Sequence, residues 1–439
     1  MPDKPKSKFA LQAAAYAKKF PYHSGVRSWP FEPYLELHKD TANDALALVL
    51  HELCESWMQG FKRKPNEKRQ TNFISCLRLI LLNLMRVQTF DAYLTVGIPS
   101  GKGRLHKERR YLPDFMSVHY HRNALKLLQD RGLVWIVKAG HQQEDYAETA
   151  RYSLTDAARD NLPLPDLKLH HFETATRDEV VLLKDTKRRL TNYTDTDATR
   201  KMRLNLRRLN KILDRTDIAA TRPLSPITDF DESYRGERTS LYRVFNNGSF
   251  EQGGRFYGGW WEHAKKVIRP KIILDRQPTV EVDFKGLHPA MLFAKKGYAI
   301  PEDPYALIPG ITGNDALRSH AKVTFLALLN AGKRGTKEPT EFDPTVHGMT
   351  KKAFQQVVKD AFPMLPGIFG TGIGLRLQRE DSDLAEKIML HFMEQGIPVL
   401  PVHDSFIIAA QHQSELIQVM KSVFHDTYGQ TPEVTITKA

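Results

Sequence analysis

Apolar residues recur at helical spacing in two stretches of the first hundred residues. From Ala42 to Trp57 and from Asn72 to Val87 they fall three and four positions apart. This spacing puts one side chain per turn on the same face, so both stretches are predicted to be amphipathic helices. The beginning of the chain is therefore expected to be mainly helical.

Residues 115–162 follow a more specific order. SVHYHRNALKLLQDRGLV predicts an amphipathic helix that ends at Gly132, and WIVK predicts a short strand. A polar turn, HQQEDYAETA, leads to RYSLTDAARDNL, which predicts a strand and then a helix with Thr155 as its N-cap. The order resembles a winged-helix unit, a nucleic-acid-binding module. An ordinary helical hairpin with a small sheet is the alternative.

A basic helix is predicted further along the chain. Residues 177–215 predict two helices joined at LTNYTDTDATR, and the second has seven basic residues and one acidic residue between Arg200 and Arg215. Its basic face suits a phosphate backbone, although a solvated face has the same pattern. Proline, aspartate and threonine then cluster in 216–238, which predicts a linker.

Two acidic residues after position 240 are candidates for metal binding. Residues 278–283 alternate apolar and polar side chains, which predicts a strand with Asp283 near its end. GIPVLPVHDSFIIAA, residues 396–410, predicts a β-hairpin with Asp404 at or near its tip. If the strands are neighbours, the two carboxylates can hold two Mg²⁺ ions, because Mg²⁺ prefers oxygen ligands. A single aspartate at a strand end is otherwise typical of a turn.

Cationic side chains surround these acids in the sequence. Residues 314–335 predict a helix in which Arg318 and Lys322 are four residues apart, with Asn330 on roughly the same face. Such a face could bind a triphosphate, or it could be a solvated helix surface. Upstream, GSFEQGGRFYGGWW combines glycines with Arg255 and aromatic rings, a pattern suited to close backbone approach, phosphate contact and base stacking. Buried tryptophans beside a turn are the alternative.

Composition narrows the class of protein. The 439 residues include 64 Lys and Arg against 51 Asp and Glu, a net charge of +13 and a pI near 9.4, which favours a polyanionic partner. The length suggests two or three domains. Cys54 and Cys76 lack zinc-site or CxxC spacing, so two free thiols and a cytoplasmic location are expected. No signal peptide and no apolar run long enough to span a membrane is expected.

Taken in order, the segments after 240 resemble the polymerase core shared by family A DNA polymerases and phage-type single-subunit RNA polymerases. VDFKGLHPAML is similar to motif A, RSHAKVTFLALLNAG to motif B and PVHDSF to motif C. GGRFYGG is similar to an upstream element that contacts template or primer. The resemblance covers roughly residues 240–439.

The resemblance implies roles for individual residues. Asp283 and Asp404 would be the catalytic metal ligands for two Mg²⁺ ions, with Mn²⁺ as an alternative ion. Lys322 would bind triphosphate with Arg318 and protonate the pyrophosphate. His288 and Asn330 would occupy the nucleotide-selection positions. Template and primer would be contacted by Arg255, Tyr257, Gln378 and His403.

The sequence also departs from that family. Asn330-Ala331 stands where motif B has a Tyr-Gly pair, and His288 stands where many DNA polymerases have a glutamate that gates the sugar. HDSF is closer to the RNA polymerase form of motif C. No Asp-x-Glu tripeptide occurs, which argues against a proofreading exonuclease.

The resemblance implies an α+β fold with a right-hand polymerase palm, fingers and thumb. We expect a mainly helical domain over 1–165, with the possible winged helix at 115–162. Thumb-like basic helices and a linker would follow over 166–239. The palm and fingers would occupy 240–439, and the palm would be an antiparallel sheet.

The function expected from these features is nucleotidyl transfer, most simply by a DNA-dependent DNA polymerase that replicates a plasmid, phage or other mobile element. DNA template and primer, or RNA, and nucleoside triphosphates are the expected partners, with no membrane. An RNA-synthesising polymerase or primase is one alternative. A catalytically inactive DNA-binding replication or regulatory protein is another, and an HD-type phosphohydrolase fits the hairpin around His403 poorly.

Overall fold

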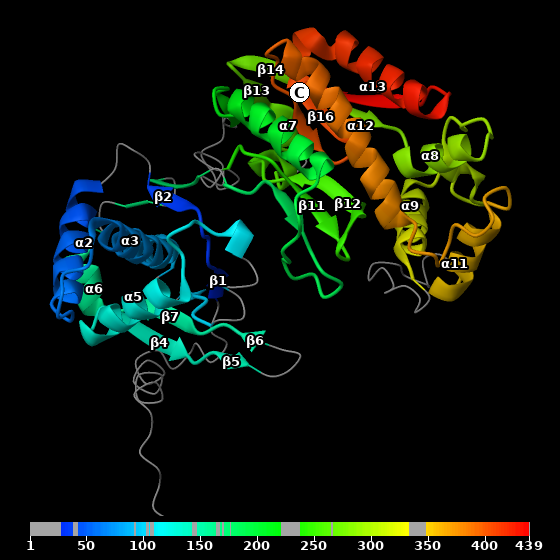
Figure 1. Cartoon of the computed structure of the whole chain (residues 1–439). Helices are drawn as coiled ribbons and strands as arrows, with labels where there is room; N and C mark the ends of the chain where they lie inside the picture. The colour runs from blue at the N-terminus through cyan, green and yellow to red at the C-terminus, as the bar shows by residue number, and fades with distance from the viewer. Residues whose placement is uncertain are drawn as a thin grey trace, which may run out of the picture. The chain divides into compact units, whose positions relative to one another are not determined.

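The structure, a computed structural model, divides into two compact units (Figure 1). Unit 1 contains residues 1–179 and 226–238, and unit 2 contains residues 180–225 and 239–439. The residues described are 28–37, 43–91, 94–101, 105, 109–142, 147–163, 167–168, 171–175, 177–220, 238–264, 267–332 and 348–438.

Unit 1 packs helices against a small sheet. Its helices are α2 (Asn43–Met58), α3 (Glu67–Phe90), α5 (Val118–Asp130) and α6 (Asp156–Asn161). Its main sheet has the order β1-β3-β7-β4, formed by Ser28–Pro30, Thr95–Gly97, Arg151–Leu154 and Val134–Lys138. The helices predicted over 42–57 and 72–87 are confirmed as α2 and α3, and Thr155 caps α6 as expected.

Helix α3 forms the centre of the unit 1 core. Its apolar side chains are almost all buried, from Phe73 to Val87. In the part of the chain that the structure describes, α3 is a helix that is long enough and apolar enough to cross a membrane. The expectation that no apolar segment reaches that length was therefore wrong. Of that apolar stretch, 61% is buried within the protein, which is also the pattern of a core helix.

Unit 2 is built on a six-stranded sheet. The strands follow the order β10-β13-β14-β16-β15, and β17 also pairs with β14. Their bounds are Ile218–Ala220, Ile272–Leu274, Gln277–Phe284, Ser405–Ala409, Leu400–Val402 and Val434–Lys438. All of these pairs are antiparallel, as expected for this half of the chain.

The helices of unit 2 pack on its strands and on one another. They are α8 (Leu287–Lys295), α9 (Asp315–Asn330), α11 (Lys351–Asp360), α12 (Gly374–Glu394) and α13 (Gln413–Tyr428). Helix α13 packs against β14 and β16, whereas α12 packs against β12 (Ser249–Tyr257), which belongs to a different sheet (Figure 1). Both helices bury apolar residues. The predicted strand with Asp283 and the predicted hairpin with Asp404 are confirmed as elements by β14 and by β15–β16.

The prediction of two helices over 177–215 is half wrong. The second is α7 (Asp197–Leu213), but the first is replaced by strand β9 (Val181–Leu183) and a turn. All three β9 residues are buried, and the strand pairs in parallel with β11 (Tyr242–Asn246), so burial on both faces overrides the helical spacing. Of the predicted linker, 218–220 forms β10 in the sheet, and 221–237 lie outside the described residues.

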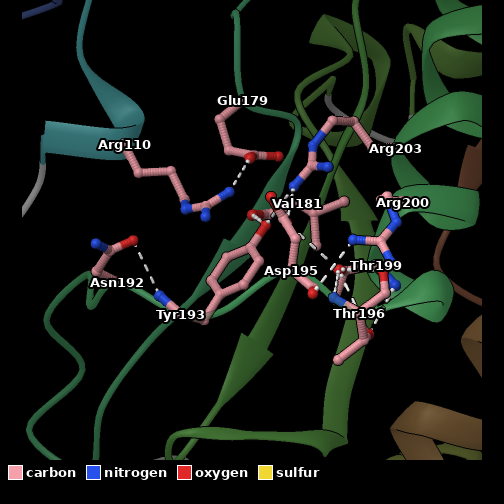
Figure 2. A network of polar contacts seen from close by, with 10 residues as sticks. All are labelled: Arg110, Glu179, Val181, Asn192, Tyr193, Asp195, Thr196, Thr199, Arg200 and Arg203. Carbon is pink, nitrogen blue, oxygen red and sulfur yellow. Dashed lines mark hydrogen bonds and ion pairs between the residues drawn. The ribbon is translucent and has the colours of Figure 1, made fainter.

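The start of α7 is fixed by a polar network (Figure 2). Thr196 and Thr199 form a capping box. Arg203 donates to Asp195 at 2.7 Å and to the hydroxyl of Tyr193 at 3.1 Å, and that hydroxyl donates to the carbonyl of Val181 at 2.9 Å. One basic residue of α7 is therefore used inside the protein to anchor the helix to β9.

Candidate active site

Antiparallel pairing brings the two predicted aspartates together. In the ladder between β14 and β16, Asp283 lies opposite Ser405, the residue that follows Asp404. The amide of Phe284 donates to the carbonyl of Asp404 at 3.3 Å. Asp404 occupies the two-residue turn between β15 and β16, so both carboxylates lie at the same end of neighbouring strands.

The charge of each aspartate affects the other. Burial and, after it, the negative charge of Asp404 raise the pKa of Asp283 to about 7. Lys322 opposes this effect, which places its ammonium within electrostatic reach of Asp283. The site therefore holds two repelling acids partly offset by a cation.

The turn that holds Asp404 has unusual backbone geometry. His403 has a φ of 59°, in the left-handed region that favours glycine. A non-glycine residue held there costs on the order of 1–3 kcal/mol, and such residues cluster at functional sites. Burial lowers the pKa of His403, and the charge of Arg255 lowers it as well.

The two cationic side chains of α9, Lys322 and Arg318, differ in whether they are bonded within the protein. Lys322 is exposed. Arg318 donates from Nε to Asp303 at 2.9 Å and lies 5.8 Å from the ring centre of Tyr305. A triphosphate bound by Arg318 would therefore compete with the carboxylate of Asp303.

A buried cluster lies beside the aspartates. Asp381 on α12 is 2% exposed, and its Oδ2 accepts from Nη2 of Arg255 at 2.6 Å. The same oxygen lies 2.8 Å from Nε2 of His288, which is also buried. His288 is thus bonded within the protein at the position where the family resemblance puts a sugar gate.

The glycine-rich element serves packing within the protein. A side chain at Gly254 would meet Phe245 at 2.7 Å and Ser382 of α12 at 2.9 Å, so the backbone of β12 (Ser249–Tyr257) approaches α12 closely there. The β11–β12 ladder also shifts register beside these glycines. Bulges of this kind redirect side chains, and Arg255 follows immediately.

Of the two interpretations of this element, the structure agrees with buried tryptophans beside a turn. Trp260 and Trp261 are 3% and 0% exposed, and Nε1 of Trp261 donates to the carbonyl of Pro401 at 3.0 Å. They are core residues that support strand β15.

The residues expected to contact template and primer lie close to the buried pair of Arg255 and Asp381. The rings of Tyr257 and His403 meet edge to face at 5.8 Å, and Gln378 lies on α12 one turn before Asp381.

Asn330, expected to select nucleotides, ends α9 about 12 Å along the helix axis from Lys322. Its side chain donates to Leu326 at 2.8 Å and abuts Gly374 of α12.

Three residues of the site were missed by sequence reasoning. Asp381 carried no signal, because a single acid in a helical pattern is ordinarily solvated. Tyr305 is buried within electrostatic reach of Asp404 and Asp283, and burial followed by these charges raises its pKa. Glu281 accepts from Ser405 at 2.6 Å and from Arg269 at 2.9 Å. Its place two residues before Asp283 was visible in the strand pattern.

The donor set fits Mg²⁺ completed by a substrate. Mg²⁺ is commonly held by one or two carboxylates together with phosphate oxygens and water. Asp283 and Asp404 supply the carboxylates, and a cation would relieve the repulsion that raises the pKa of Asp283. Among the described residues, no group of three or more His, Cys, Asp or Glu side chains could hold an ion without such completion.

No protein-family model and no curated protein sequence matches this chain. Among solved structures, the chain is similar to the POL domain of Pol1 from M. smegmatis, in complex with DNA primer-template and dNTP. The TM-score is 0.32 at 10% identity, and the match covers 54% of this chain and 50% of that chain. The chain thus spans about half of that structure. At this level of similarity, function has to rest on the residues of the site.

Proposed function

We propose that unit 2 is a template-directed nucleotidyltransferase, most simply a DNA-dependent DNA polymerase without proofreading. One observation carries the proposal. Asp283 and Asp404 lie at the same end of paired strands, and the charges of Asp404 and of Lys322 on α9 both act on Asp283. Two acids with an opposing cation suit the transfer of a nucleotide between hydroxyl and pyrophosphate oxygens.

Each residue of the site has a part in this proposal. Asp283 and Asp404 would hold Mg²⁺, and the bound ions would supply activation of the 3′-hydroxyl and charge neutralisation at the leaving pyrophosphate. Lys322 binds the triphosphate and donates a proton to the leaving oxygen. Arg318 exchanges Asp303 for a phosphate when nucleotide binds, since both partners are anionic.

The remaining residues of the site position the nucleic acid. Arg255, held by Asp381, faces the turn that carries Asp404, because the charge of Asp404 acts on its guanidinium. Tyr257 and His403 form an edge-to-face ring pair next to it. This surface suits the end of a primer, where a phosphate and a base pair must be held beside the metal ligands.

Synthesis of RNA is the second candidate, and one observation favours it. His288 is buried and bonded to Asp381, so its position offers no carboxylate to exclude a 2′-hydroxyl. A catalytically inactive DNA-binding protein is disfavoured, because Asp404 and Lys322 both lie within electrostatic reach of Asp283.

Primer extension tests the proposal. A labelled primer annealed to a DNA template is incubated with Mg²⁺ and either dNTPs or NTPs, and an unprimed template is run in parallel. A ladder with dNTPs supports a DNA polymerase, and a ladder with NTPs supports RNA synthesis. Absence of extension under all conditions, with DNA binding retained, would leave the inactive binding protein as the better reading.

Two variants assign the activity to the site. Asp404→Asn keeps the shape of the turn and removes one negative charge, so extension should disappear. Asp426→Asn, at an exposed position on α13, is the matched control and should extend primers like the unchanged protein.

A further inference from the structure

Unit 1 contains a helix and a hairpin arranged in the way many duplex-binding modules use. Helix α5 is followed by β4, the short hairpin β5–β6 (His141–Gln142 and Ala147–Glu148) and β7. Strands β4 and β7 pair with each other, and β3 pairs with the far side of β7. Residues 143–146, between β5 and β6, lie outside the described residues.

One face of α5 is packed and the other is polar. His121, Ala124, Leu125 and Leu128 are buried, and α5 packs on α3 and β4. The opposite face carries His119, Arg122, Asn123 and Lys126, which are exposed or half-buried. With 13 residues, α5 is roughly 20 Å long, and a helix of its width fits the major groove of B-DNA.

The polar face has the side chains that read bases. Nδ2 of Asn123 lies 3.1 Å from the ring of His119, which orders the amide. Arg122 donates from Nε to the carbonyl of Ser100 at 2.9 Å, and its terminal nitrogens carry four further N–H donors. Arginine reads guanine and asparagine reads adenine through paired hydrogen bonds in the major groove.

The charge around α5 matches a polyanion. Between residues 101 and 138 the sequence has nine Lys and Arg against three Asp and Glu. Lys126 is paired with Asp130 at 2.7 Å, so one cation of the face is partly neutralised within the helix. Arg109 and Arg110 are also paired, with Asp114 at 3.2 Å and Glu179 at 3.0 Å. The excess of cations in the sequence of this segment still favours a phosphate backbone over a neutral or basic protein partner.

We propose that the polar face of α5 binds duplex DNA in the major groove and selects sequence through Arg122 and Asn123. This site lies entirely in unit 1 and does not depend on the proposed nucleotidyl transfer. Its role would be to bring the chain to particular duplex sites, which a polymerase site that reads only base pairing cannot do.

Selection from a random duplex library tests the proposal. The full-length protein is presented with 20-base-pair random DNA duplexes closed at both ends by hairpin loops, so that no primer end is available. A sequence motif should be enriched over successive rounds. Bound fractions for the enriched duplex and a scrambled duplex should differ by at least 10-fold, since each paired contact contributes roughly 10- to 100-fold of discrimination. No enrichment would overturn the proposal.

Variants locate the selectivity. Arg122→Ala with Asn123→Ala should lose the preference for the motif but keep weak, salt-sensitive binding, and Lys68→Ala, an exposed cation on α3, should keep the motif. Retention of the motif by the double variant would overturn the proposal. So would equal affinity for an RNA duplex of the same sequence, because the narrow major groove of A-form RNA excludes a helix.

Motif selection by α5 and primer extension at the proposed polymerase site can be tested independently of each other. Asp404→Asn should abolish primer extension and leave motif selection unchanged, and the double variant in α5 should extend a plain primed template normally. Loss of the motif in Asp404→Asn would place the binding in unit 2 and overturn the proposal. Failure of all extension with motif selection intact would count against the proposed polymerase only.

Discussion

The carboxylate of Asp381 is buried in α12 and binds the guanidinium of Arg255 at 2.6 Å. The two residues are 126 positions apart in sequence, and the pair lies beside the turn that carries Asp404. A buried ion pair fixes a long side chain in one geometry, and removing one partner leaves the other charge uncompensated. Asp381 therefore acts as a positioning residue for Arg255.

Replacing Asp381 with asparagine should weaken primer binding. Without the negative charge, Arg255 loses its fixed position, so we expect the KM for primer-template to rise roughly 10-fold or more, in line with a charged hydrogen bond of about 1.5–3 kcal/mol. Steady-state extension at fixed dNTP measures this. The control is Glu380→Gln on the same helix as Asp381, which removes an ion pair with Lys295 of α8. Equal effects of both variants would show that Asp381 only supports the fold.

Binding of Mg²⁺ should weaken as the pH falls below 7. The pKa of Asp283 is raised to about 7, and a ligand carboxyl must be deprotonated, so protons compete with metal below that pH. We expect the affinity to fall about tenfold per pH unit between pH 7 and 5. Calorimetric titration with Mg²⁺ across this range measures it, and a flat profile would contradict the shift.

The raised pKa of Asp283 also predicts how the stability of the metal-free protein depends on pH. The folded pKa of Asp283 is above its ordinary value of 3.8, so its ionisation opposes folding. Stability should fall as the pH rises from about 4 to 7. Asp283→Asn should therefore raise the melting temperature of unit 2 at pH 8 without metal. Asp426→Asn should leave it unchanged.

Alanine substitutions at Lys322 and at Arg318 should change different kinetic parameters. Lys322→Ala removes the proton donor in the proposal, so kcat should fall by about 10² to 10⁴. Arg318→Ala removes a triphosphate contact, so the KM for nucleotide should rise by roughly 10- to 100-fold with a smaller change in kcat. Single-nucleotide incorporation kinetics separate the two parameters. Val323→Ala, an exposed neighbour on α9, is the control.

Acid should destabilise unit 1 through His121. The ring is fully buried against Phe31 at 5.4 Å, and burial lowers its pKa from 6.5 to about 4. The unfolded chain binds the proton more readily, so stability is complete above pH 6.5 and falls towards pH 4. The expected loss is about 3 kcal/mol. Chemical unfolding followed by tryptophan fluorescence measures it, and His121→Phe should flatten the profile between these pH values.

The sequence by itself determined the elements of the candidate site. Alternation around Asp283 and apolar residues on both sides of His403-Asp404 defined a strand and a hairpin, because the period of two needs no distant contact. The same local signals gave α2, α3, α7 and the order of elements around α5. They failed at Val181–Leu183, where a partner strand outweighs local helical spacing.

Only the tertiary structure decided which side chains meet. The register that sets Asp283 opposite Ser405 joins segments 122 positions apart. The pairing of Asp381 with Arg255 and His288 depends on the close approach of β12 to α12 at Gly254. Tertiary packing also buries Trp260, Trp261 and His288. Such outcomes depend on packing between distant segments, which sequence periodicity does not record.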